Sequence, residues 1–187
     1  PAAEAYPQAQ QLLAEGKYEE AAKAFADLGG YEEASRLALY AQAHAEAAKG
    51  NYGLAVRSMT ALGDFRDAAL QATYYQVQGL LAQAPYDTYN YLEAETILPM
   101  LGAFRQSHEI DVNAVAYQDG LRLVEAGSFE AAVDVFHFLA NRSYQDASTQ
   151  KAYARARNYE AAGKLVDAVE EYSLLGEFRD SATRVQA

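Results

Sequence analysis

Histidine, cysteine and paired carboxylates build most catalytic and metal sites, and this chain offers few of them. Its 187 residues include three histidines, His44, His108 and His137, and no cysteine. The histidines lie far apart and lack the His-x-x-x-His spacing that places two metal ligands on one face of a helix. No glycine-rich phosphate loop, Gly-x-Ser-x-Gly elbow or paired-carboxylate motif accompanies them. We therefore predict no catalytic residue, no metal ligand and no cofactor, and expect the chain not to be an enzyme.

Tyrosine is the residue type that stands out, with 15 copies and no tryptophan. Five of them recur at one position of a repeat and are called here the tyrosine ladder: Tyr6, Tyr40, Tyr74, Tyr117 and Tyr153. One interpretation is packing at the edge of the core, with each hydroxyl reaching solvent. The other is that the rings line a binding groove, because a repeated position forms a continuous row along a repeat protein. For that second interpretation the candidate ligand-binding residues are three ladder residues and three residues four positions beyond a ladder tyrosine: Tyr40, Tyr74, Tyr117, His44, Gln78 and Arg157.

The segment 85–91 is the clearest local irregularity. It begins with a proline and mixes turn-forming residues with Tyr86, Tyr89 and Tyr91. Rings on a loop can dock on a partner or stack on a sugar. Alternatively, Tyr91 is simply the first aromatic residue of a helix, and Tyr86 and Tyr89 cover the core over a widened turn. Tyr86 and Tyr89 join the candidate binding residues.

A repeat positions these residues. A small residue inside the second helix of each unit recurs at spacings of 34, 39, 38 and 36 residues, at Ala21, Ala55, Ala94, Ala132 and Ala168. A period near 34 indicates stacked helical hairpins. The longer spacings place insertions within 84–91, 108–113 and 140–143. We expect repeats at about 2–29, 31–63, 65–102, 104–140 and 144–176, followed by half a repeat at 178–187, in a single domain over 1–187.

Apolar residues at spacings of three and four predict the second (B) helices at about 18–28, 52–62, 91–101, 129–139 and 165–175. The first (A) helices are expected at about 31–48, 65–83, 105–126 and 144–162, after an opening helix near 2–15. A glycine follows four of the B helices, where a residue of left-handed conformation ends a helix. Acidic residues such as Asp64 and Asp67 are expected in the first turn of the next A helix. Pro99 predicts a kink or an early end in the third B helix.

The pattern Gly-x-Tyr-x-x-Ala-x-x-x-aromatic resembles the tetratricopeptide (TPR) family. It is carried by Gly16, Tyr18, Ala21 and Phe25, and again by Gly50/Tyr52/Ala55/Met59, Gly127/Phe129/Ala132/Phe136 and Gly163/Leu165/Ala168/Tyr172. The closing proline of the family is replaced by Leu-Gly-x-aromatic-x-acid-Ala, so the chain looks like a divergent variant of the kind seen in Gram-positive bacteria. This resemblance implies an all-α, right-handed solenoid of about five antiparallel helix hairpins. It also implies a concave surface lined by A helices that binds peptides or proteins.

The charge of the chain limits its partners. Its 26 acidic and 15 basic residues give a net charge of −11, which disfavours nucleic acids and anionic membranes, since both attract basic surfaces. No window approaches the 18 apolar residues of a membrane helix. A protein or peptide partner, basic in character, fits better, although such acidity also serves solubility alone. Neither a targeting signal nor a cysteine assigns a compartment.

Two functions therefore remain open at this stage. The first is a non-catalytic scaffold, part of a larger protein, that binds a protein or peptide on its A-helix face. The alternative is glycan or cell-wall binding through the segment 85–91 and the tyrosine ladder, because aromatic faces suit the C–H surfaces of sugars. The half repeat at 178–187 also predicts end-to-end self-association.

Overall fold

The computed structural model describes residues 1–83 and 87–186, and within these residues it is all-α, with no strand. The A helices are α1 (Ala2–Ala14), α3 (Ala34–Ala48), α5 (Ala68–Gln83), α7 (Val112–Glu125) and α9 (Ala147–Ala161). The B helices are α2 (Tyr18–Asp27), α4 (Tyr52–Leu62), α6 (Tyr89–Ile97), α8 (Phe129–Ala140) and α10 (Leu165–Leu175). Two 3-10 segments, η2 (Leu98–Leu101) and η3 (Phe104–Glu109), lie between α6 and α7, and the short helix α11 (Ser181–Val185) follows α10.

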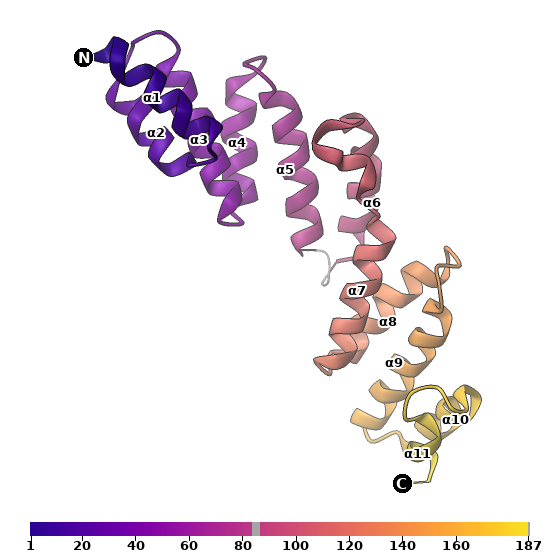
Figure 1. The fold of residues 1–187 in the computed structure, drawn as a ribbon. Helices are drawn as coiled ribbons and strands as arrows, with labels where there is room; N and C mark the ends of the chain where they lie inside the picture. The colour runs from indigo at the N-terminus through magenta and orange to yellow at the C-terminus, as the bar shows by residue number, and fades with distance from the viewer. Residues whose placement is uncertain (84–86, 187) are drawn as a thin grey trace. The chain divides into compact units, whose positions relative to one another are not determined.

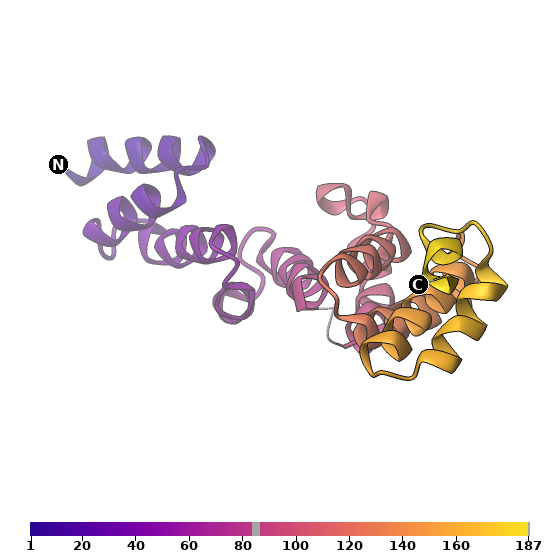
Figure 2. The same cartoon turned by 90° about the horizontal axis from the view of Figure 1, so that it is seen from below.

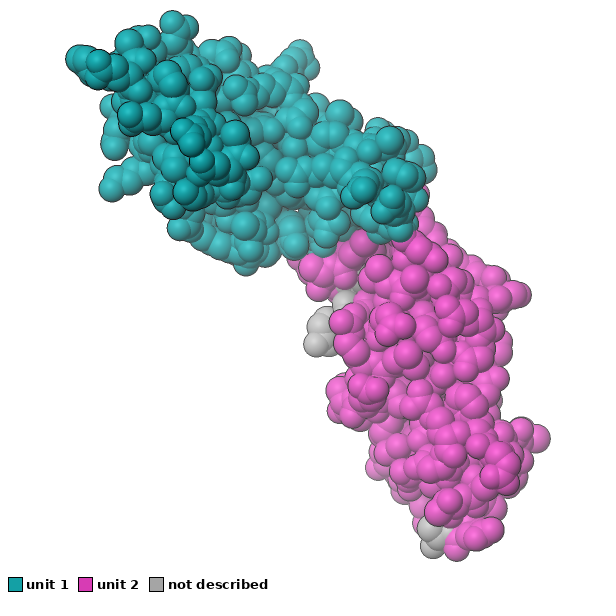
Figure 3. Space-filling view, in the orientation of Figure 1, with its two compact units in different colours: residues 1–80, 96–110 teal, residues 81–95, 111–187 magenta. Residues whose placement is uncertain are grey.

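The chain forms two compact units (Figure 3). Unit 1 comprises residues 1–80 and 96–110, and unit 2 comprises residues 81–95 and 111–187. The divisions between the units fall inside α5 and α6. Each unit has its own set of packed helices, and the two are described separately below.

Within each unit, helices that follow one another in the chain pack side by side (Figure 1, Figure 2). In unit 1, α1, α2, α3 and α4 make successive contacts, and in unit 2 the same holds for α7, α8, α9, α10 and α11. The alanines that mark the repeat are all buried, from 0 to 3% exposed. A small side chain at this position lets neighbouring helices approach closely. Gly120 serves the same purpose beside Tyr117, because a Cβ atom there would lie 2.7 Å from the ring of the buried Phe136.

The A helices begin later than the sequence pattern predicts. The expected starts at 31, 65, 105 and 144 are replaced by starts at Ala34, Ala68, Val112 and Ala147. The reason is a turn in which the residue after an aromatic takes a positive φ, between 45° and 53°, and therefore cannot belong to a right-handed helix. This residue is Glu32, Arg66, Arg105, Gln145 or Arg179.

The ends of the B helices follow the prediction in one respect and depart from it in another. Gly63 and Gly176 do have positive φ, 58° and 59°, but their ψ of −123° lies outside the left-handed helical region. This is a conformation that glycine alone adopts readily. Pro99 ends α6 early, as predicted, because the helix stops at Ile97 and continues as the 3-10 segment η2.

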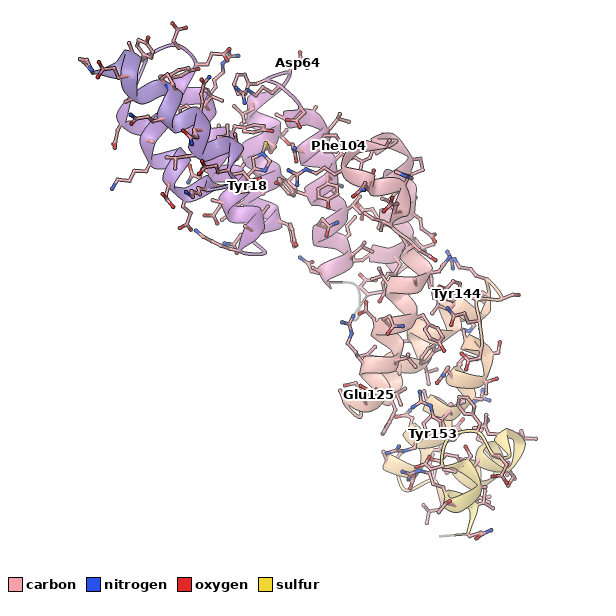
Figure 4. All side chains as sticks on the ribbon, viewed as in Figure 1. Tyr18, Asp64, Phe104, Glu125, Tyr144 and Tyr153 are labelled. Carbon is pink, nitrogen blue, oxygen red and sulfur yellow. The ribbon has the colours of Figure 1, made fainter. Side chains whose placement is uncertain are left out.

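Asp111 caps the A helix α7, because its side chain accepts a hydrogen bond from the backbone N–H of Ala114 at 3.0 Å. The acids of three other connecting turns, Asp67, Asp146 and Asp180, form a different contact. They accept hydrogen bonds from ladder tyrosines of the preceding A helix instead. The hydroxyl of Tyr40 donates to Asp67 (2.5 Å), that of Tyr117 to Asp146 (2.5 Å) and that of Tyr153 to Asp180 (2.6 Å; Tyr153 is labelled in Figure 4). A residue four positions beyond each acid, Gln71, Gln150 or Arg184, donates to the same carboxylate. Three tyrosines of the ladder thereby join consecutive repeats.

This hydrogen bond is expected to contribute measurably to stability. Replacing Tyr40 with Phe keeps the buried ring and removes only the donor to Asp67. We expect the Tyr40→Phe variant to lose about 1–2 kcal/mol of unfolding free energy in urea denaturation, since a half-buried carboxylate loses one of its donors. Tyr89→Phe, at a ring that is 76% exposed, is the matched control and should leave stability unchanged. Equal stability of the two variants would contradict the structural role of the ladder.

Candidate functional site

A pocket of about 200 Å³ opens between α3 and α5 in unit 1 and is called here the His44 pocket. It combines four tyrosine rings with one imidazole, one amide and one guanidinium. It contains no Asp or Glu, although the chain as a whole is strongly acidic. Its lining residues are Tyr18, His44, Ala47, Ala48, Tyr52, Tyr74, Tyr75, Gln78 and Arg105.

His44 is the buried centre of this pocket, only 3% exposed. Its ring stacks on Tyr18, with centroids 4.7 Å apart, and meets the edge of Tyr40 at 4.5 Å. Its Nδ1 atom shares a hydrogen bond of 2.5 Å with the Tyr75 hydroxyl. Burial, and then the positive charge of Arg105, lower the pKa of His44 to about 4. The imidazole is therefore neutral at neutral pH and is held in place by aromatic contacts.

The rim of the His44 pocket is rich in free hydrogen-bond donors. The hydroxyls of Tyr18, Tyr52 and Tyr74 make no hydrogen bond within the described residues. Arg105 lies over the rings of Tyr74 (5.4 Å) and Tyr75 (5.9 Å), and it forms no ion pair or hydrogen bond with any residue that the structure describes. The pocket can therefore stack on a flat group and donate hydrogen bonds to an acceptor.

Nothing in the His44 pocket resembles a catalytic arrangement. His44 has its Nδ1 atom committed to Tyr75 and is enclosed by rings, so a substrate would not reach it as a base. Burial raises the pKa of the Tyr75 hydroxyl to about 12, which makes it a poor nucleophile. The geometry supports binding by stacking and hydrogen bonding.

A second and larger pocket, of about 550 Å³, lies in unit 2 between the start of α6 and the length of α8; it is called here the Tyr89 pocket. Tyr89 stands beside it with 76% of its surface exposed. Its floor is apolar and its rim is polar. The lining residues are Asp87, Thr88, Tyr89, Leu92, Ala131, Asp134, Val135, His137, Phe138, Asn141 and Arg142.

The structure brings together some of the predicted site residues and separates others. His44, Tyr74 and Gln78 line the His44 pocket, and the buried Tyr40 packs against His44 from behind. Tyr89 lines the other pocket, whereas Tyr86 lies outside the described residues.

The remaining two predicted residues, Tyr117 and Arg157, make contacts with neighbouring helices and turns. The Tyr117 hydroxyl bonds to Asp146, and its ring meets Phe136 with centroids 5.9 Å apart. Arg157 lies 4.6 Å from the ring centroid of Phe129 and donates to the Tyr153 hydroxyl. Neither residue lines the two pockets described above.

Besides Ala47 and Ala48, sequence reasoning missed the four tyrosine and arginine residues of the His44 pocket that are discussed here. Tyr18 and Tyr52 open B helices in the Gly-x-Tyr motif, which is more simply interpreted as core packing. Tyr75 directly follows the ladder residue Tyr74 in the sequence. It reaches His44 because consecutive residues of a helix point in different directions. Arg105 enters the pocket because the turn after Phe104 reverses the chain, and the sequence pattern predicted a helix at that point.

Comparison with family models, with curated proteins and with solved structures finds no match to this chain. Among the described residues, no group of three or more His, Asp or Glu is arranged to hold a metal ion. None of the helices in residues 1–83 and 87–186 is long and apolar enough to cross a membrane.

The lowered pKa of His44 predicts a pH dependence of stability. Below its ordinary pKa of 6.5 the unfolded chain takes up a proton at His44, and the folded chain does so only near pH 4. The contribution of His44 to stability is therefore complete above pH 6.5, and it is lost as the pH falls from 6.5 to about 4. Between about pH 7 and pH 5 we expect a loss of about 2 kcal/mol in the unfolding free energy.

Urea denaturation of the wild type and of His44→Gln at both pH values measures this effect. The variant should lack that part of the pH dependence, whereas His108→Gln, at a histidine with 58% of its side chain exposed, should behave like the wild type. If His44→Gln retains the full wild-type pH dependence, His44 is not the responsible group.

Proposed function

We propose that the chain is a non-catalytic, TPR-like scaffold that binds a segment of a protein or peptide on its A helices. In this proposal the helix pairs form a right-handed solenoid of about five hairpins. The chain is part of a larger protein, and catalysis is not among its functions. The His44 pocket is the observation that carries the proposal.

The size of the His44 pocket suits one side chain of a bound segment. A cavity of about 150 Å³ is enough to admit benzene, so 200 Å³ accommodates one planar group. Tyrosine rings bury apolar area at little cost in side-chain entropy, which is why they are frequent at binding sites. The free hydroxyls and Arg105 would then orient a group that accepts hydrogen bonds. An aromatic or amide side chain, or a carboxylate, meets both requirements.

The position of the pocket also supports this function. His44 lies on α3, and Tyr74, Tyr75 and Gln78 lie on α5, so the central wall of the pocket is built from A helices. Tyr18 and Tyr52, at the starts of α2 and α4, complete the lining of the pocket. A repeat protein offers such a surface to an extended partner because equivalent positions of neighbouring repeats are adjacent.

The alternative function, glycan binding along the tyrosine ladder, receives less support. Tyr40 and Tyr153 are 8% and 3% exposed, so their faces are covered by protein. The hydroxyls of Tyr40, Tyr117 and Tyr153 are committed to acids of the following turn. Tyr89 keeps an exposed ring, and a sugar at that residue is tested together with the inference below.

Selection of binding peptides from a displayed random library provides the test. For the selected peptides, we expect Arg105→Gln and Tyr74→Phe each to weaken binding by about tenfold, because each removes a free donor of the pocket. Fluorescence anisotropy of the labelled peptides measures the dissociation constants. Arg57→Gln, at an exposed arginine of α4 outside the pocket, is the matched control and should bind normally.

Two results would contradict the proposal. One is a selection that yields no peptide for a folded sample. The other is a set of peptides that bind Arg105→Gln and Tyr74→Phe as tightly as the wild type, which would place the binding surface elsewhere.

A further inference from the structure

We propose that the Tyr89 pocket binds a lysine or arginine side chain from a basic segment of a partner protein. This inference goes beyond the function proposed above. It concerns a pocket of unit 2 that is lined by the B helices α6 and α8. Its proposed ligand is a cation, whereas Arg105 in the His44 pocket favours a carboxylate or another hydrogen-bond acceptor. The argument rests on three features of the pocket: its floor, its charges and its exposed ring.

The floor of the Tyr89 pocket is apolar. Val135 and Phe138 are buried in α8, and Leu92 of α6 adds a side chain that is 42% exposed. Lysine and arginine carry three or four methylene groups below their charge and commonly lay this stem on apolar surface. The floor therefore suits the stem of a basic side chain better than a small ion.

The rim of the pocket is acidic. Asp134 projects from α8 and forms no hydrogen bond or ion pair with any described residue. Asp87 uses one oxygen to accept from the backbone N–H of Tyr89 at 2.9 Å, which offsets the positive start of α6 and leaves its second oxygen available. Two carboxylates are thus in place for an incoming cation.

The positive charge on this rim is already neutralised. Arg142 pairs with Glu95 at 3.2 Å, donates to the Phe138 carbonyl at 3.1 Å and lies 3.7 Å from the Phe138 ring centroid. Arg142 is thereby held against the wall of the pocket and does not need Asp134 or Asp87 as a partner. Counting Glu95, three carboxylates stand against one guanidinium.

The surroundings favour the same ligand. Unit 2 carries 15 Asp and Glu against 8 Lys and Arg, so a basic segment is attracted over a distance. The exposed ring of Tyr89 offers a face to an ammonium or guanidinium group.

Binding of a defined peptide tests the inference. The probe is a short glycine–serine peptide with three lysines, blocked at both ends and carrying an uncharged fluorophore. Its counterpart carries acetyl-lysine in place of lysine, which keeps the stem and removes the charge. Fluorescence anisotropy at low ionic strength measures the affinity of each peptide for the full chain.

The expected results are specific to two residues. Asp134→Asn should weaken binding of the lysine peptide by about threefold to fivefold, and Tyr89→Ala by a similar factor. Asp167→Asn removes the same charge from an exposed site of α10 in the same unit and should change affinity by less than about twofold, because distant charges are screened. The acetyl-lysine peptide should bind at least about fivefold more weakly than the lysine peptide.

Several results would overturn the inference. They are equal effects of Asp134→Asn and Asp167→Asn, equal binding of the two peptides, and no binding of the lysine peptide. A chito-oligosaccharide that binds the wild type, loses affinity in Tyr89→Ala and is unaffected by Asp134→Asn would assign the pocket to a sugar instead. Because the variants lie outside the His44 pocket, failure here leaves the function proposed for unit 1 standing.

Discussion

The hydrogen bond from a ladder tyrosine to the acid of the next turn is the interaction on which the architecture of this chain most depends. It joins residues 27 to 29 positions apart and connects one A helix to the start of the next. A hydrogen bond from a hydroxyl to a carboxylate is stronger than one between neutral groups. It contributes more to stability where both partners are shielded from water. In three turns this contact lies beside the left-handed residue that precedes the next helix, Arg66, Gln145 or Arg179. In these three turns the packing of consecutive helix pairs and the shape of the turn therefore support each other.

Two ladder tyrosines, Tyr6 and Tyr74, depart from this pattern. Tyr6 packs its ring on Phe25 and Tyr31, while Glu33 of the following turn bonds to Arg36 instead. The departure at Tyr74 is the more informative one. In the turn that follows Tyr74, the position of the acid is occupied by Gln106, and both Arg105 and Gln106 have positive φ. Tyr74 consequently has no carboxylate partner among the described residues, and its hydroxyl is left at the His44 pocket. Arg105 is turned over the same ring and also lacks an acidic partner. At this turn the Tyr74 hydroxyl and the Arg105 guanidinium therefore lack a carboxylate partner among the described residues. Hydrogen-bond donors that the fold leaves unpaired are available to a ligand, and this supports the binding function proposed for the His44 pocket.

The sequence predicted the helical repeat well because its signals are local. Apolar spacing, helix-ending glycines and Pro99 each act within a few residues, so the B helices lie close to their expected bounds and α6 ends early. The A-helix starts were wrong by three to seven residues, since a left-handed residue such as Arg66 or Gln145 leaves no mark in composition. The role of the ladder stayed open for a different reason. Whether the Tyr40 ring faces a groove or the core depends on Asp67 and Phe65, which the fold brings to it from the next repeat.

Net charge was the least informative guide to the candidate sites. A chain of −11 suggests a uniformly acidic surface, yet the His44 pocket has no acid in its lining and the Tyr89 pocket has two. The difference arises from pairing, because charges that meet inside the fold no longer act on a ligand. The charge of Arg142 at the Tyr89 pocket is paired with Glu95, whereas Arg105 and Asp134 have no ion-pair partner among the described residues. The two proposed binding pockets therefore differ in the charge that each leaves unpaired, Arg105 in unit 1 and Asp134 in unit 2.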